Sequence, residues 1–376
     1  MAIAGGGVAA HRCAFRLRDL GYEGTITLVS GERRAPYDRT ALTKSALASP
    51  RAVPPPLSNP TSYKAAEIEL RLDSFARKLL PESKRILCRD GSEVPYDALV
   101  IATGASPIVP PALRAPGVIT IRNADDARSL LEAAACANTV VVVGGGLIGC
   151  EIASSLCAPD RSITVIEASW GPLGDLLGAE VAMRLAEFHR AAGIEMLTET
   201  TVLSVDSTAG GYEVELDGGD RLTADLVVVA VGARPEVSWL EDSGVELNGG
   251  IATDPFCRTT VANVFAAGDC VVFPSERLQR RVRMEHWDAA ALHGAAAAQN
   301  LLGTLESFDP VPFFWSDQHG VKLSMTGLPH RGDQVEIEES TDGLLASFRG
   351  PNGHSAVFGL GRTREVVRFR REMEGR

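Results

Sequence analysis

Three glycines in the middle of the chain have the spacing of a phosphate-binding turn. They follow a run of valines in VVVVGGGLIGCE (140–151), where Gly144, Gly146 and Gly149 fit the pattern G-x-G-x-x-G. In this pattern the first glycine allows a tight turn, the second lets the backbone approach a pyrophosphate, and the third lets the helix pack closely on the strand. The motif therefore predicts a buried strand, a glycine turn and a helix whose N-terminus faces phosphate groups.

A residue that could select the coenzyme follows at the expected distance. Dinucleotide-binding folds with this glycine motif have a carboxylate at the end of the next strand, where it binds the ribose hydroxyls. In the apolar stretch SITVIEAS (162–169), Glu167 occupies this position. A carboxylate accepts hydrogen bonds from a 2′-hydroxyl and repels a 2′-phosphate, and no arginine immediately follows Glu167. We therefore expect NADH rather than NADPH at this site. A purely structural turn between strand and helix is the alternative.

The N-terminus repeats the arrangement. Gly5, Gly7 and Ala10 form G-x-G-x-x-A after a short apolar strand, and a helix and the strand TITLVS (25–30) follow. Ser30 stands where the second motif has Glu167, so Glu32 would have to reach the ribose from slightly later in the chain. Two dinucleotide folds in one chain suggest two dinucleotides that meet, and the usual pair is FAD and a nicotinamide.

Composition and charge narrow the class of protein. The chain has 376 residues, enough for two or three domains, and its formal net charge of −11 argues against a nucleic-acid partner. No apolar run reaches membrane-spanning length and no signal peptide precedes the first glycines, so we expect a cytoplasmic protein without membrane association. The sequence leaves the oligomeric state open, and a homodimer is one alternative.

Cysteines and histidines show no spacing that indicates a redox or metal centre. The seven cysteines form neither C-x-x-C nor C-x-x-x-x-C, which argues against a redox-active disulfide or an iron–sulfur cluster. Cys150, within the second nucleotide helix, is expected to be packed rather than reactive. The seven histidines lack ligand spacing, so no metal site is predicted.

Six further motifs point to a family. They occur in this order: PYDRTALTK (36–44), DALVIATGASP (97–107), ADLVVVAVGARP (224–235), TTVANVFAAGDC (259–270), RMEHWDAA (283–290) and VPFFWSDQHG (311–320). Together they resemble the FAD-dependent ferredoxin reductases of bacterial oxygenase systems, the group with putidaredoxin reductase and the reductase components of aromatic-ring dioxygenases. The resemblance extends over nearly the whole chain.

The first glycine motif and the resemblance together imply a flavin site assembled from many segments. The implied FAD residues are Gly5, Gly7, Ala9, Ala10, Glu32, Arg39, Lys44, Ala76, Thr103, Gly104, Arg122, Gly268, Asp269, Trp287 and Trp315. Gly232, in the counterpart of the Thr103-Gly104 segment after the second fold, is a further cofactor residue. The resemblance places Ala76 at the adenine through its backbone and Arg122 between the domains.

Three residues are candidates for a catalytic role. The resemblance implies that Lys44 lies near the isoalloxazine, that Glu151 approaches Lys44 near the nicotinamide, and that Trp287 lies beside the flavin ring. Asp269 would bind the ribityl and phosphate region. The alternatives are a solvated Lys44, a Glu151 exposed on its helix, an Asp269 that caps a following helix, and Trp287 and Trp315 as ordinary core residues.

The resemblance implies an enzyme that passes electrons from NADH through FAD to a 2Fe–2S ferredoxin or Rieske-type protein serving an oxygenase. Two other interpretations stay open. One is an NADH oxidase, peroxidase or coenzyme A-disulfide reductase, although these need a cysteine soon after the first fold and none lies between Cys13 and Cys88. The other is a redox-switch flavoprotein resembling apoptosis-inducing factor.

The predicted fold is α/β, with two Rossmann-like dinucleotide-binding domains of the glutathione-reductase type and a small α+β C-terminal domain. The FAD domain is expected at 1–109 and 234–308, with the NAD domain inserted at 110–233. The C-terminal domain, 309–376, is expected to contain the strands KLSMTG, QVEIEE, LLASFRG and SAVFGLG.

Two arginine clusters could bind an acidic protein partner. The first comprises Arg277, Arg280, Arg281 and Arg283, and the second comprises Arg362, Arg364, Arg368, Arg370 and Arg371. Because the whole chain is acidic, a local basic patch would be needed to attract an acidic ferredoxin. The first cluster is favoured, since it immediately precedes Trp287. A solvated loop and tail are the alternative.

Overall fold

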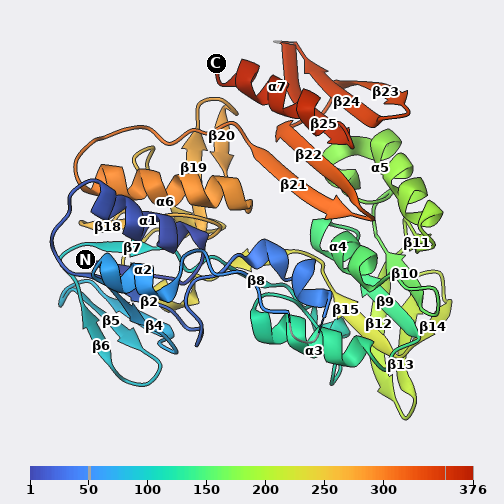
Figure 1. Ribbon diagram of the computed structural model, residues 1–376, viewed down its shortest axis with the longest axis horizontal. Helices are drawn as coiled ribbons and strands as arrows, with labels where there is room; N and C mark the ends of the chain where they lie inside the picture. Colours follow the sequence, from blue (N-terminus) through green and yellow to red (C-terminus); the bar gives the residue numbers. More distant parts are fainter. Residues whose placement is uncertain (50–51, 352, 376) are drawn as a thin grey trace. The chain divides into compact units, whose positions relative to one another are not determined.

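Each glycine motif follows a short buried strand of a parallel sheet. These strands are β1 (Ala2–Ala4) and β9 (Thr139–Val143). The structure is a computed structural model that describes residues 1–49, 52–351 and 353–375 (Figure 1). The chain forms two compact units: unit 1 comprises Met1–Asp38, Pro55–Ser106 and Arg234–Phe313, and unit 2 comprises Arg39–Pro54, Pro107–Ala233 and Phe314–Arg376.

Unit 1 is built on a five-stranded sheet. In sheet order its strands are β18 (Val264–Ala266), β7 (Leu99–Ile101), β1, β2 (Ile26–Val29) and β3 (Ile68–Arg71). All four pairings are parallel, so the carboxyl ends of the strands lie at one edge. Buried β-branched and aliphatic side chains fill both faces, as parallel sheets require.

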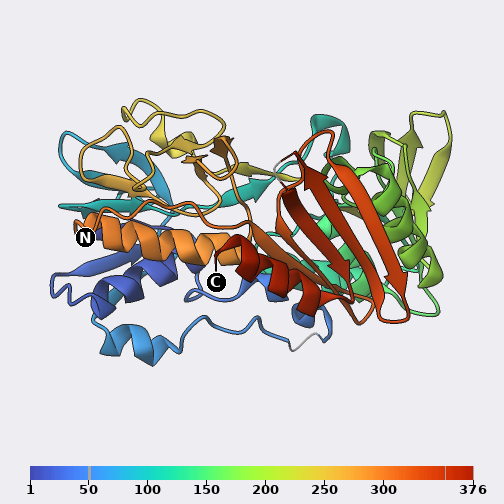
Figure 2. The same ribbon diagram turned by 90° about the horizontal axis from the view of Figure 1, so that it is seen from above.

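Two helices of unit 1 pack closely on each other. They are α1 (Val8–Asp19) and α6 (Trp287–Leu301), which lie side by side in Figures 1 and 2. A Cβ atom on Gly294 of α6 would lie 2.1 Å from the carbonyl oxygen of Ala9 in α1. Only glycine therefore permits this approach of the two helices.

Smaller elements complete unit 1. One antiparallel sheet contains β4 (Ala76–Leu80), β5 (Arg85–Cys88) and β6 (Glu93–Pro95). Another contains β17 (Ile251–Ala252), β19 (Val271–Ser275) and β20 (Arg280–Val282). The remaining helices are α2 (Pro60–Ala65) and η4 (Ser238–Leu240). The short strands β8 (Ala105–Pro107) and β16 (Ala233–Pro235), which span the boundaries of unit 1 along the chain, form a two-stranded sheet.

Unit 2 contains the second parallel sheet. Its strands, in sheet order, are β11 (Glu195–Leu197), β10 (Ser162–Ile166), β9 and β15 (Leu226–Val229). The helices of this part are η1 (Arg39–Ala41), η2 (Ser45–Leu47), η3 (Pro111–Leu113), α3 (Ala124–Ala134), α4 (Leu147–Leu156) and α5 (Gly174–Ala191). An antiparallel sheet of β12 (Val202–Thr208), β13 (Gly211–Leu216) and β14 (Arg221–Ala224) adds Val205 and Val214 to the core.

The C-terminal part of unit 2 is a five-stranded sheet followed by a helix (Figure 2). Its strands, in sheet order, are β21 (Phe313–Gln318), β22 (Val321–Gly327), β25 (Gly353–Leu360), β24 (Gly343–Gly350) and β23 (Gln334–Ser340). The helix is α7 (Thr363–Met373). One apolar core joins Leu177, Val181 and Leu185 of α5 to side chains of this sheet.

The predicted fold class is confirmed: the chain is α/β, with two Rossmann-like sheets and a small α+β part at its C-terminus. The predicted functional domains, 1–109 with 234–308, 110–233 and 309–376, stay a prediction. The compact units group residues 39–54 and the C-terminal sheet with the second Rossmann-like sheet. Within the described ranges, no helix combines the length and apolar character needed to cross a bilayer.

Candidate functional site

The second glycine turn has the backbone shape that the motif predicts. Gly144 has φ +109°, and a Cβ atom there would lie 2.4 Å from the carbonyl oxygen of Ala230. A Cβ atom on Gly149 would lie 1.9 Å from the carbonyl oxygen of Gly144. Gly146 is the N-cap of α4 without a side-chain cap, and a Cβ atom on it would meet nothing within 4 Å. The turn therefore fits a phosphate group next to the first amides of α4.

The carboxylate of Glu167 lies against this turn. Its Oε2 accepts a hydrogen bond of 2.7 Å from the N–H of Gly145, and its Oε1 accepts one of 2.8 Å from the N–H of Ser169. Both bonds come from backbone, so the carboxylate is held in one orientation at the end of β10. This geometry fits the ribose-binding role that the spacing predicts.

The first turn has the same backbone arrangement. The N–H of Gly5 donates to Val29 at 2.8 Å, as the N–H of Gly144 donates to Ile166 at 2.8 Å. A Cβ atom on Gly5 would lie 2.0 Å from the carbonyl oxygen of Ala102. Gly7 is the uncapped N-cap of α1, and the next turn of this helix contains the buried residues Ala9 and Ala10. The first turn is therefore a second candidate phosphate site.

The two turns differ where the ribose would bind. Ser30 occupies the place of Glu167, since a Cβ atom on Gly6 would lie 2.2 Å from its Oγ. The carboxylate of Glu32 instead accepts a 2.6 Å hydrogen bond from the hydroxyl of Tyr37. Ala76 begins β4, two residues after Ser74, whose N–H donates to the carbonyl of Ser30.

The other predicted flavin residues of unit 1 follow neighbouring strands of its sheet. Thr103 and Gly104 come after β7, and Gly268 and Asp269 come after β18. Because β18, β7 and β1 are adjacent and parallel, these residues share the carboxyl edge with Gly5. This edge is where open α/β sheets bind ligands.

Contacts within unit 1 fix these segments. Thr103 donates its hydroxyl proton to the carbonyl of Glu236 at 2.7 Å, and the carbonyl of Gly104 accepts the N–H of the same residue at 2.9 Å. The N–H of Gly268 donates to Nδ1 of His293 at 3.2 Å. Strand β19, not a helix, follows Asp269, which excludes the helix-capping alternative.

Trp287 begins α6 and is half-buried. The guanidinium carbon of Arg12 lies 6.0 Å from the centre of its ring, at the limit of a cation–π contact. Trp315, on β21 in unit 2, is also half-buried.

Lys44 and Glu151 meet in unit 2. The Nζ atom of Lys44 lies 2.7 Å from Oε1 of Glu151, and its side chain is 21% exposed. Glu151, on α4, is 6% exposed and also accepts hydrogen bonds from the hydroxyls of Thr43 and Ser316. The structure therefore excludes both a freely solvated Lys44 and an exposed Glu151.

Arg39 and Arg122 also come together in unit 2. The guanidinium of Arg39 donates to the carbonyl oxygen of Arg122 at 2.7 Å. Asn123 then caps α3 in a capping box with Asp126. Gly232 follows β15, the strand that pairs in parallel with β9, and β9 leads into Gly144.

Sequence reasoning missed Thr43 and Ser316 as partners of Glu151. Thr43 directly precedes Lys44, and Ser316 belongs to the motif FWSDQ, so both stood in segments that the resemblance had singled out. The available signal was a polar residue at a buried position of an alternating strand, which needs a partner.

Cys150, on the helix that follows the second glycine turn, is 1% exposed. Burial raises the pKa of the Cys150 thiol, whose hydrogen points to the carbonyl of Gly145. The expectation that Cys150 is packed is therefore confirmed. Among the described residues, no three side chains of histidine, cysteine, aspartate or glutamate gather as metal ligands.

The sequence matches two family descriptions in succession. Residues 1–294 match the pyridine nucleotide-disulphide oxidoreductases, and residues 313–376 match the reductase C-terminal domain. The chain therefore belongs to the pyridine nucleotide-disulphide oxidoreductase family and is an oxidoreductase. Membership of this family implies binding of FAD and NAD(H), in agreement with the two glycine turns.

Individual relatives indicate which kind of oxidoreductase the chain resembles. The ferredoxin–NAD(+) reductase component of the anthranilate 1,2-dioxygenase system of Burkholderia cepacia is 34% identical over 97% of this chain and 88% of the relative. A ferredoxin reductase from Rhodopseudomonas palustris superposes with a TM-score of 0.93 at 29% identity, over 97% of this chain and 92% of that chain.

A third comparison involves a bound partner. The reductase in the covalent putidaredoxin reductase–putidaredoxin complex superposes with a TM-score of 0.92 at 27% identity, over 98% of this chain and 91% of that chain. These similarities confirm the predicted resemblance to the ferredoxin reductases of oxygenase systems.

Proposed function

We propose that the protein is an NADH:ferredoxin reductase that contains FAD and delivers electrons to a 2Fe–2S ferredoxin or Rieske-type protein serving an oxygenase. The observation that carries the proposal is the ion pair of Lys44 with the buried Glu151. Lys44 occupies the segment after the first fold, where the disulfide-reducing members of the wider family need a cysteine. The reductase components and ferredoxin reductases among the relatives support the same assignment.

The residues divide between binding and positioning. Backbone amides at the starts of α1 and α4 would hold the pyrophosphates of FAD and NADH, and Glu167 would bind the ribose of NADH. FAD, when bound, can accept a hydride and give up the two electrons singly. The cation of Lys44, held by Glu151, would stabilise negative charge next to the flavin.

The roles of the other expected FAD-binding residues are also proposals. Residues at the carboxyl edge of the unit 1 sheet, Thr103, Gly104, Gly268 and Asp269, would line the FAD site. Trp287 and Trp315 would lie near the flavin ring. Arg39 and Arg122, which are joined by a hydrogen bond, would contact the cofactor.

Rapid anaerobic mixing tests the proposal. The purified yellow protein is mixed with NADH, and flavin bleaching is followed before and after addition of oxidised ferredoxins from a panel. We expect fast bleaching and recovery of the flavin spectrum with at least one ferredoxin. Slow bleaching with a long-lived long-wavelength band would favour the redox-switch interpretation, and turnover with oxygen or coenzyme A disulfide alone would favour the oxidase or disulfide-reductase interpretation.

The structure also bears on where an acidic partner would dock. In the first arginine cluster, Arg281 donates to the carbonyls of Thr253 and Val272, and Arg283 pairs with Glu285. Two of the four guanidinium groups therefore hold unit 1 together. This weakens the preference for the first cluster as a docking surface.

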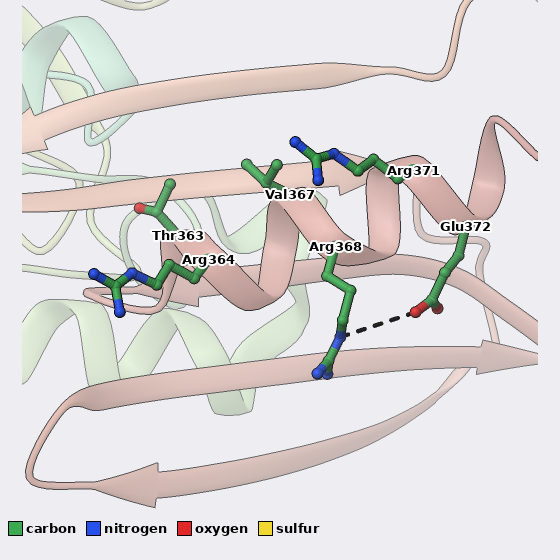
Figure 3. Close-up of a pocket in the computed structure, with 6 residues that line it drawn as sticks. All are labelled: Thr363, Arg364, Val367, Arg368, Arg371 and Glu372. Carbon is green, nitrogen blue, oxygen red and sulfur yellow. Dashed lines mark ion pairs between the residues drawn. The ribbon is translucent and has the colours of Figure 1, made fainter. Parts of the chain in front are cut away.

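In the second cluster, Arg362 and Arg370 pair with Glu365 and Glu374, and the other three arginines are more exposed. Arg364, Arg368 and Arg371 are exposed along α7, about one helical turn apart. With Thr363, Val367 and Glu372 they line a pocket on this helix (Figure 3). Arg368 makes only a loose ion pair of 3.9 Å with Glu372, and within the described residues no ion pair joins Arg364 or Arg371. We therefore propose these three arginines, the α7 stripe, as the docking surface.

A further inference from the structure

Two polar side chains occupy the buried face of β21, where apolar residues would be expected. The strand alternates between half-buried and buried positions, so Phe314, Ser316 and Gln318 share its buried face. Phe314 packs in the apolar core formed with α5, as this face requires. Ser316 and Gln318, at 0% and 2% exposure, follow at the next two positions. Burial of a hydroxyl and an amide is tolerated only when hydrogen bonds replace water.

Gln318 donates a hydrogen bond to Ser316, and Ser316 donates one to Glu151. The Nε2 atom of Gln318 donates to Oγ of Ser316 at 2.9 Å. Because that oxygen accepts the amide proton, the hydroxyl proton of Ser316 is left to donate to Oε1 of Glu151 at 2.5 Å. The chain of donors therefore ends on the carboxylate of Glu151.

The same carboxylate oxygen binds Lys44. Oε1 of Glu151 lies 2.7 Å from Nζ of Lys44, while Oε2 accepts the hydroxyl proton of Thr43. Glu151 is 6% exposed, so these three donors replace most of its hydration. Hydrogen bonds from both sides hold the carboxylate in one orientation, and this orientation directs Oε1 at the ammonium group of Lys44.

We propose that Ser316, oriented by Gln318, is a positioning residue for Lys44. It keeps the carboxylate of Glu151 directed at Lys44, so the C-terminal sheet takes part in the flavin-reduction step. The inference rests on the proposed function, which places Lys44 next to the flavin. It assigns a role to two residues that touch neither coenzyme in the proposed function.

A double-mutant cycle in unfolding tests the coupling without any turnover. The free energy of unfolding in denaturant is measured for Ser316→Ala, Lys44→Met and the double variant. We expect the two effects to be non-additive. The matched control is Ser324→Ala on the adjacent strand β22, because Ser324 is also 0% exposed but faces Thr363, not Glu151. Its effect should add to that of Lys44→Met.

The pH dependence of flavin reduction by NADH is the second readout. Ser316→Ala loses a donor to Glu151, so we expect slower reduction and a pH profile that differs from that of the wild type. Ser316→Thr keeps the hydroxyl and should restore the wild-type rate and profile. Gln318→Met keeps Ser316 but removes its orienting donor, and should slow reduction less than Ser316→Ala does.

Failure of the inference and failure of the proposed function are distinguishable. Additive unfolding energies for Ser316→Ala and Lys44→Met, or a pH profile of Ser316→Ala equal to that of Ser324→Ala, would overturn the inference. A wild-type protein that NADH fails to reduce would overturn the proposed function. In that case the unfolding cycle would still decide whether Ser316 positions Lys44.

Discussion

Glu167 is a single carboxylate whose environment should decide the choice of coenzyme. Each of its oxygens accepts one backbone N–H, which leaves further lone pairs for the two hydroxyls of a ribose. A 2′-phosphate at the same place would put two negative groups together. The anion is fixed by backbone, so it cannot easily turn away from the phosphate.

We therefore expect kcat/KM for NADH to exceed that for NADPH by about tenfold or more. Glu167→Ala removes both the hydrogen bonds to the ribose and the repulsion, so it should lower the NADH value, raise the NADPH value and narrow the ratio. Steady-state kinetics with both coenzymes measure this. Glu187→Ala, on the exposed side of α5, is the control and should leave the ratio unchanged. Equal use of both coenzymes by the wild type would contradict the assignment.

Individual site residues could be predicted from the sequence where their role depends on their spacing along the chain. Glu167 and the glycines have fixed separations that a strand–turn–helix unit imposes, so they could be found without coordinates. The partners of Glu151 come from positions 43, 44 and 316, and their meeting depends on how α4 packs against other segments. Lys44 and Glu151 were identified only through the resemblance.

Among the elements, α5 carries a buried histidine that should make stability depend on pH. His189 is 0% exposed, and its Nδ1 lies 3.0 Å from Nε2 of His319, in the turn between β21 and β22. Burial, followed by the neighbouring His319, lowers the pKa of His189 from 6.5 to about 4. The unfolded chain therefore binds a proton at this position that the folded protein does not bind between these pH values.

The neutral His189 should contribute fully to the free energy of unfolding above pH 6.5. This contribution should be lost as the pH falls towards 4, and the total loss should be about 3 kcal/mol. His189→Gln removes the titrating group and should flatten the fall in unfolding free energy over this range. Denaturant unfolding at several pH values measures the difference. His330→Gln, at an exposed position, should follow the wild-type curve. Parallel curves for the wild type and His189→Gln would contradict the prediction.

The elements themselves were largely predictable. Runs such as VVVV and LVVV favour buried parallel strands, and the four short C-terminal segments that were expected to be strands lie within strands of the structure. The grouping of residues 39–54 with the second sheet was not predictable. That grouping depends on contacts such as the hydrogen bond from Ser155 to the carbonyl of Thr43, which span more than a hundred residues.

The whole molecule has a formal net charge of −11, so binding of an acidic partner should depend on the local electrostatic potential at the docking surface. An acidic ferredoxin is repelled by most of the surface, so the exposed arginines of the α7 stripe should determine its rate of approach. Screening by salt acts over about 10 Å at 0.1 M, so the effect should be largest at low ionic strength.

Arg364→Glu with Arg371→Glu should lower the rate of ferredoxin reduction by about tenfold at low salt and less at high salt. Reduction of ferricyanide by NADH should hardly change, because a small acceptor needs no docking surface. Arg280→Glu, at an exposed position of the first cluster, tests the alternative surface. A larger loss with Arg280→Glu than with the α7 variant would move the docking surface to the first cluster.

The discontinuity of unit 1 has a consequence for the order in which the protein folds during synthesis. The second parallel sheet is complete once residue 229 has left the ribosome, since its strands lie between Thr139 and Val229. The first sheet begins with β1 but lacks β18 until Ala266, and α1 lacks its packing partner until α6 ends at Leu301. During synthesis, therefore, the second sheet can form first. Until β18 and α6 are made, β7 has an unpaired edge and α1 has an uncovered face.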